Sequence, residues 1–228
     1  DGSLRRLRRI LIRDAQLHVR NSRQVSFFDA RDLNIELIRN KNGALKISNS
    51  TTIHYKDYNT SIVAEFSMNK EQPDINGVVE FSELMPHVLS GMFYDDADIK
   101  SFAVPISGKV TMAFDKQGTA QNIGFDIFGS KGNITSDRLS ANLPITSMRV
   151  KGNVKDDFHA VNVESLSVNM EGMKLESNFA ANNFDTASDA GATPEIKAAI
   201  IMTEVPSDKV NILWPPALSP MSREWVTS

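Results

Sequence analysis

The residue types best suited to catalysis or metal binding are scattered through this sequence and form no recognised motif. The four histidines, His18, His54, His87 and His159, are far apart, and no HExxH or similar spacing joins one to a second metal ligand. The sequence also has no GxSxG nucleophile elbow, no P-loop and no dinucleotide fingerprint. We therefore predict that the protein is not an enzyme, with no catalytic residues, no metal site and no cofactor.

Two short segments have the composition of ligand-binding loops but not their full pattern. Asp95, Asp96 and Asp98 lie in an acidic stretch that suits calcium, yet it lacks the glycine and distal glutamate of an EF-hand. The segment 129–132, Gly-Ser-Lys-Gly, is too short to cradle a phosphate and is predicted to end the strand before it. A solvated loop is the favoured interpretation of the acidic stretch.

Composition indicates a folded protein of ordinary chemistry. The chain has 228 residues, of which 41% are hydrophobic and 23% charged, and its net charge of −3 gives no support to nucleic-acid binding. It contains no cysteine, which excludes disulfides and thiol chemistry. It begins at Asp1 without a methionine, and we expect a piece or processed form of a longer protein. The basic run 4–13 fits either a solvated face or a patch touching acidic lipid.

The most regular part of the sequence runs from Val104 to Ile134. Hydrophobic and polar residues alternate there on both sides of a turn at 115–118, which is typical of a half-buried antiparallel strand pair. Gly118 suits a turn position that requires a positive φ. The residues predicted to share the apolar face, which are our candidate lipid-binding residues, are Val104, Ile106, Val110, Met112, Phe114, Ile123, Phe125 and Ile127.

The same alternation recurs through the ranges 15–68, 75–81, 146–180 and 196–203. Between two of these runs, Asn-Lys-Asn-Gly at 40–43 predicts a tight hairpin. The fold class is therefore mainly β, with long antiparallel strands that form either a curled, groove-like sheet or a sandwich.

Two segments break the alternation and are predicted to be helical. One is a short helix near residues 83–90, capped by Ser82, and the other is the C-terminal segment 205–228. We therefore divide the chain into a β domain, residues 1–204, and a helical cap or linker, residues 205–228. The range 182–194 is rich in turn-forming residues and is predicted to be a long loop.

A short pattern with a central glycine occurs three times. Gly77, Gly108 and Gly152 each stand between two apolar residues, in the form apolar-x-Gly-x-apolar. A glycine at an inward position of a strand often marks a bend or a close backbone approach. The unequal spacing leaves open whether the pattern marks repeated ribbons or recurs by chance.

Three pieces of the sequence resemble one protein family. The segment PISGKVTMAFDKQGTAQNIGFDIFGSKGNI resembles a recurrent segment of AsmA-like proteins, in particular the large YhdP-type members related to TamB. The opening LRRILIRDAQLHVRN resembles a strand of the same proteins. The tail resembles their tryptophan-proline segment with a following arginine-tryptophan, and the matching residues are Trp214, Pro215, Arg223 and Trp225.

This resemblance implies a periplasmic part of an inner-membrane-anchored envelope protein. Such proteins hold phospholipid acyl chains in an apolar β groove and move them toward the outer membrane, which supports envelope integrity. The implied partners are phospholipid, adjacent segments of the parent chain, and the membrane through a part of the parent that this chain lacks. No nucleic acid is implied.

The residues themselves leave two functional classes open. In the first, the apolar face lines a lipid-binding groove and needs no catalytic group, because buried methylenes stabilise the complex. In the second, the domain is a scaffold that docks neighbouring segments or envelope partners through strand edges or the tail, with Trp214, Arg223 and Trp225 as docking residues. A helical cap over the end of the sheet is the alternative interpretation of that tail.

Overall fold

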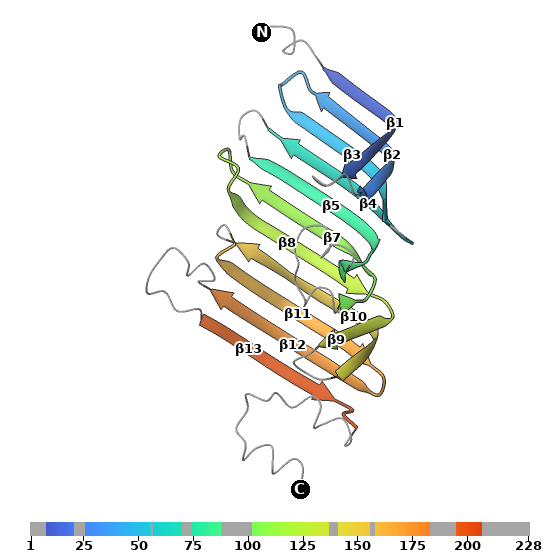
Figure 1. The fold of residues 1–228 in the computed structure, drawn as a ribbon. Coiled ribbons are helices and arrows are strands. Elements are labelled where there is room, and N and C mark those ends of the chain that lie inside the picture. The colour runs from blue at the N-terminus through green and yellow to red at the C-terminus, as the bar shows by residue number, and fades with distance from the viewer. Residues whose placement is uncertain are drawn as a thin grey trace.

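The computed structural model describes residues 8–20, 26–55, 57–69, 74–87, 102–136, 141–155, 158–182 and 195–206. These residues form a single open sheet of 13 strands in which every pairing is antiparallel (Figure 1). The prediction of a mainly β fold built from long antiparallel strands is therefore confirmed.

Eleven strands follow one another across the sheet in chain order, and a short pair lies off this path. The eleven are β1 (Arg9–Arg20), β2 (Ser26–Arg39), β3 (Leu45–Tyr55), β4 (Tyr58–Met68), β5 (Ile75–Leu84), β7 (Ile106–Phe114), β8 (Ala120–Gly129), β10 (Ala141–Lys155), β11 (Ala160–Met170), β12 (Met173–Asn182) and β13 (Glu195–Thr203). The short pair is β6 (Phe102–Ala103) and β9 (Gly132–Ser136), and β9 also pairs with the first residues of β10.

Tight turns join many of these strands, where the sequence placed them. In the β2–β3 turn the Gly43 N–H donates to the Asn40 carbonyl at 2.9 Å, and Gly43 has a φ of 87°. In the β7–β8 turn the Gly118 N–H donates to the Asp115 carbonyl at 3.0 Å, and Gly118 has a φ of 86°. Glycine adopts this left-handed conformation without the steric cost that a Cβ brings. Within the 40–43 turn only the glycine has a positive φ.

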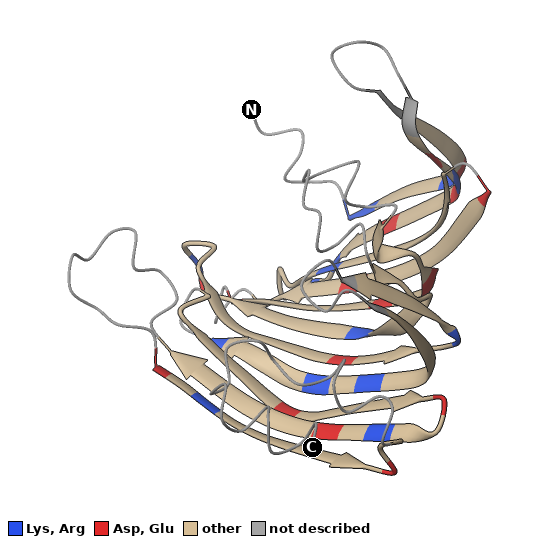
Figure 2. Cartoon of the chain, turned by 60° about the horizontal axis from the view of Figure 1, so that its bottom comes forward, with Lys and Arg blue, Asp and Glu red and all other residues tan. Residues whose placement is uncertain are grey.

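The described residues form one layer and not two. Each strand makes its extensive contacts with its hydrogen-bonded neighbours, and no second sheet packs on this one within the described ranges. Figure 2 shows that the strands bow and that the β1–β2 end turns away from the plane of the other strands. Alternation predicts only that one face is shielded, so the sequence did not distinguish this sheet from a sandwich.

The helix expected near residues 83–90 does not begin directly after Ser82. β5 continues through Ser82 to Leu84, where we expected a helix to begin. A helical turn starts only at Pro86 and His87, which is consistent with the preference of proline for the first helical position. The rest of that segment, residues 183–194 of the loop predicted at 182–194, and most of the C-terminal segment 205–228 lie outside the described residues.

A small hydrophobic core forms where the short strands β6 and β9 meet the beginning of β10. Val104 and Ile145 are 0% and 2% exposed and pack with Met170 and Met173. Seven further side chains surround these four, and they are Phe102, Ile134, Leu143, Met148, Val168, Leu175 and Val205. We call this cluster of buried side chains the β6–β9 core.

Candidate functional site

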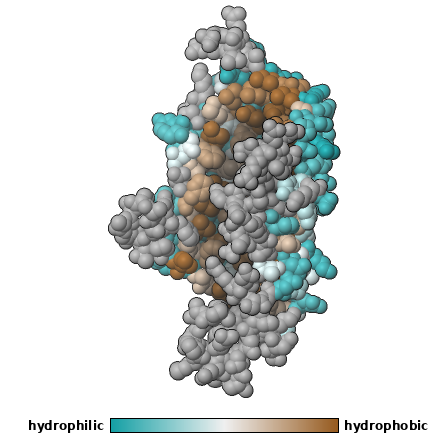
Figure 3. Space-filling view, in the orientation of Figure 1, coloured by the Kyte–Doolittle hydropathy of each residue, from teal (hydrophilic) through white to brown (hydrophobic). Residues whose placement is uncertain are grey.

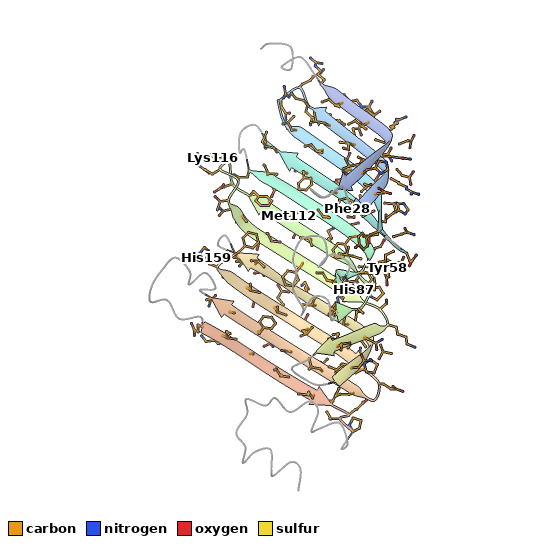
Figure 4. The ribbon with its side chains drawn as sticks, in the orientation of Figure 1. Phe28, Tyr58, His87, Met112, Lys116 and His159 are labelled. Carbon is orange, nitrogen blue, oxygen red and sulfur yellow. The ribbon has the colours of Figure 1, made fainter. Side chains whose placement is uncertain are left out.

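The apolar residues predicted from the central ribbon lie together on one face of β7 and β8. The register places Val110 opposite Phe125 and Met112 opposite Ile123, and directly paired residues share a face. Because side chains alternate along a strand, Ile106, Phe114 and Ile127 also lie on this face. These seven side chains are all half-buried. Met112 lies well inside the sheet, away from both of its edge strands (Figure 4).

Neighbouring strands extend this apolar face in both directions. The pairing of Val79 with Val110 carries it to β5, and the pairing of Val150 with Ile127 carries it to β10. Continued through the register, it includes Ile10, Ile12, Ile35, Leu37, Ile47, Ala64, Phe66 and Phe81 on one side and Val154, Val163, Leu166, Leu175, Phe179, Ile196 and Ile200 on the other. Figure 3 shows hydrophobic residues gathered on this face, with hydrophilic residues along its margins.

Glycines on the apolar face make room for side chains from the neighbouring strand. Gly77 is paired with Phe66, and a Cβ added to Gly77 would lie 2.5 Å from the Phe66 ring. Gly152 is paired with Phe125, and a Cβ there would lie 2.8 Å from that ring. Both rings therefore lie close over the backbone of the adjacent strand. The recurrent apolar-x-Gly-x-apolar pattern marks this close approach, and all three of its glycines face the apolar side.

Val104, the eighth predicted residue, lies apart from the other seven. It precedes β7 and is fully buried in the β6–β9 core. There it packs with Ile145, Met170 and Met173, beside the short strands β6 and β9. The sequence pattern did not reveal this difference, because packing against distant residues such as Ile145 and Met170 leaves no mark on the local alternation.

Asn49, on β3, is one of the polar residues that the register places on the apolar face, as are Thr51 and Ser177. Asn49 is paired with Ile35 on one side and Ala64 on the other. Its Oδ1 atom is buried and has no hydrogen-bond partner among the described residues. A buried acceptor without a hydrogen-bond partner costs free energy, so Asn49 is an unfavourable polar group on this face.

The opposite face of the sheet is polar and carries ion pairs between neighbouring strands. Arg149 donates two hydrogen bonds to Asp126, at 2.8 and 2.9 Å, and this bonding lowers the pKa of the Asp126 carboxyl. Lys109 lies 3.2 Å from Glu80. With Phe128, these residues line an open depression of about 550 Å³. Figure 2 shows the charged positions distributed over many strands. These charged side chains make this face of the sheet suitable for exposure to solvent.

The histidines take part in separate local contacts and do not gather into a site. His18 Nδ1 lies 2.6 Å from Asp29 Oδ1, and this hydrogen bond lowers the pKa of Asp29. His54 Nδ1 lies 2.6 Å from Asn59 Oδ1. The His87 ring packs edge-on against Tyr58, with the ring centroids 5.5 Å apart (Figure 4). Within the described ranges, no three His, Asp or Glu side chains gather where they could hold a metal ion.

The predicted docking residues Trp214, Arg223 and Trp225 lie outside the described residues, as does the acidic stretch 95–98. Among the residues that are described, none belongs to a helix with the length and apolarity to span a membrane. Comparison of the chain with protein-family models, with curated proteins and with solved structures finds no match. The resemblance to AsmA-like proteins therefore stays a prediction that depends on the sequence segments alone.

Proposed function

We propose that this chain is a non-enzymatic periplasmic module of an inner-membrane-anchored, AsmA-like protein that binds phospholipid acyl chains in an apolar β groove. The observation that carries the proposal is the apolar face, which continues across eleven strands of one sheet and is uncovered by a second sheet in the described residues. Soluble proteins rarely leave a large contiguous apolar surface without a binding role.

The size of the face suits long, flexible, apolar ligands. At about 4.8 Å between neighbouring strands, eleven strands extend over roughly 48 Å, and a nine-residue strand is about 30 Å long. The bowed strands seen in Figure 2 would shelter chains lying along this surface from water. Each buried methylene contributes about 0.8 kcal/mol, so an acyl chain binds without any directional contact.

The side chains of β7 and β8 form the centre of the proposed wall. Ile106, Val110, Met112, Phe114, Ile123, Phe125 and Ile127 offer aliphatic, thioether and aromatic surface with no charged group. Methionine adapts its shape to irregular partners. A wall of this kind holds lipid without fixing its position, which suits transport between membranes. Val104 is assigned to the β6–β9 core and not to this wall.

The test is mass spectrometry of an organic extract of the detergent-free protein, with a mock purification as the control for contaminating lipid. We expect phospholipid in the protein extract at an amount comparable to the protein. The variant Met112→Asp/Phe125→Asp places two carboxylates on the wall and should lose that lipid, because burying an ionised carboxylate against acyl chains is costly.

The matched control uses the other face of the same strand. Phe128 is 55% exposed on the polar face of β8, so Phe128→Asp changes the same residue type in the same way but away from the wall. It should retain lipid, and circular dichroism should show β structure in all variants. Lipid that stays bound to the folded double variant would contradict the proposal.

A further inference from the structure

The strand β13 forms one edge of the sheet, and its outer side has no hydrogen-bonded strand among the described residues. Nine consecutive pairs join it to β12 without a register shift, from Glu195 opposite Asn182 to Thr203 opposite Lys174. All nine residues of β13 are exposed, and Ile200 and Ile201 are 61% and 60% exposed. A long, regular, apolar edge with unpaired N–H and C=O groups is a template for another strand.

β13 lacks the features that normally protect an edge. It contains no proline, glycine or bulge, and its two charged residues, Glu195 and Lys197, pair with each other at 2.8 Å. The opposite edge strand, β1, is protected. The pairing of β1 with β2 shifts register at three places, Asp14 has a φ of 52°, and the described side chains of β1 include three charged ones, Arg9, Arg13 and Asp14.

We propose that β13 pairs with β13 of a second copy of this chain, antiparallel about a two-fold axis at Ala199. On the apolar face this register places Ile196 opposite Met202 and Ala198 opposite Ile200. On the polar face Lys197 lies opposite Ile201, and no like charges face each other. The apolar faces of the two copies then lie on the same side of one continuous sheet. Because β1 is protected, the assembly closes as a dimer and does not extend into a filament.

The backbone of β13 is oriented for this pairing. Thr146 Oγ1 donates to the Asn169 carbonyl at 3.1 Å, so the Asn169 carbonyl points toward β10 and the backbone groups of Met170 point toward β12. Backbone groups alternate in direction along an antiparallel ladder. Met170 is paired with Met173, so the backbone groups of Met173 point toward β11 and, five residues on, those of Asn178 point toward β13. Asn178 is paired with Ala199, so the Ala199 N–H points toward β12 and the Ala198 N–H points toward the open edge.

Two neighbouring alanines therefore provide a matched pair of proline variants. Ala198→Pro removes an N–H that faces only the second copy, whereas Ala199→Pro removes an N–H that bonds to β12. By sedimentation equilibrium we expect the natural chain to dimerise. In Ala198→Pro two intermolecular bonds are lost, which should raise the dimer dissociation constant by at least about 30-fold. Its urea midpoint, measured below the dimerisation range, should stay unchanged, while that of Ala199→Pro should fall.

Crosslinking tests the register independently, because the chain has no cysteine of its own. In the proposed dimer the two copies of residue 199 form a non-hydrogen-bonded pair with Cα atoms roughly 4.5 Å apart, which suits a disulfide. Ala199→Cys should therefore form a covalent dimer on oxidation. Ile201→Cys lies on the same face of β13, but its two copies are roughly 13 Å apart, so it should not crosslink.

Three results would overturn the proposal. One is a natural chain that stays monomeric at the highest concentration, and another is equal crosslinking of the two cysteine variants. The third is a continuous series of larger species, which would mean that β13 joins β1 of the next copy. Loss of lipid binding in a chain that still dimerises would count against the proposed function and leave this inference intact.

Discussion

The apolar face contains two regions with similar side chains and very different burial. In the β6–β9 core, Val104 and Ile145 are almost completely removed from water. On β7 and β8, Met112 and Phe125 belong to the same face of the same sheet but remain partly exposed. The difference comes from how many neighbouring side chains pack around each residue and not from the residue types themselves.

This difference separates the residues that hold the fold together from those that are available to a ligand. The hydrophobic contribution to stability follows the apolar area removed from water. The β6–β9 core has already buried its area in folding. The open part of the face keeps area that a bound chain can bury, so we expect substitutions there to change binding more than stability.

The largest effect expected from this comparison is on the stability of the β6–β9 core. Ile145→Ala should lower the free energy of unfolding by about 2–5 kcal/mol, because it leaves a cavity among fully buried neighbours. Met112→Ala, on the open part of the face, should lower it by only about 1 kcal/mol, because the lost side chain was partly in water. Urea denaturation followed by circular dichroism measures both values.

The lipid content of the same two variants should change in the opposite order. Met112→Ala reduces the proposed wall, whereas Ile145→Ala leaves it unaltered while the protein remains folded. If the two variants lose equal stability, the β6–β9 core is not the distinct structural region that its burial indicates.

A smaller effect is expected from filling the space beside a glycine. In Gly77→Ala the new methyl group meets only the Phe66 ring, which must move off the backbone of β5 toward the open side of the face. We expect a loss of about 1–3 kcal/mol in stability, typical of overpacking, and less bound lipid because the surface becomes uneven. Both are measured as above, by urea denaturation and mass spectrometry.

Gly124 provides the control for this variant. It lies on the polar face, where an added Cβ would meet the Thr111 hydroxyl at 2.7 Å, and that side chain can rotate away. Gly124→Ala should therefore keep its lipid. Equal lipid loss in the two glycine variants would show that the effect comes from the sheet as a whole and not from its apolar face.

Much of the sheet could be predicted from the sequence, because the alternation of hydrophobic and polar residues along each strand indicates which of its sides faces water. The alternation in 104–134 predicted both strands of the central ribbon, β7 and β8, and Gly43 and Gly118 predicted the positions of two turns. The shared face of seven of the eight candidate residues followed from the same pattern. The recurrent glycines also had the predicted meaning, since Gly77 and Gly152 accept neighbouring rings.

Other features depend on contacts between segments distant in the chain, and the sequence pattern does not record these. Val104 fits the alternation of β7, but its burial depends on Ile145 and Met170, which are more than forty residues away in the sequence. The helix expected near 83–90 does not start directly after Ser82, because pairing with Ser61 keeps the chain extended there, and a helical turn begins only at Pro86. Local cap signals are weak compared with a sheet that continues through them.

The smallest effect concerns the polar face, where the ion pairs are exposed to water. Arg149 lowers the pKa of Asp126, chiefly through hydrogen bonding, so this pair stabilises the fold fully above the ordinary carboxyl pKa of 3.8. The contribution is lost as the pH falls through the lowered pKa in the folded state. Arg149→Gln should therefore lower the urea midpoint slightly at a pH of about 6, and this deficit should shrink as the pH is lowered below the ordinary carboxyl value. Lipid content should be unchanged, since Arg149 lies on the opposite side of the sheet from Phe125. A variant that retains its stability deficit at low pH would show that Arg149 acts through packing of its side chain over Phe128 and not through its charge.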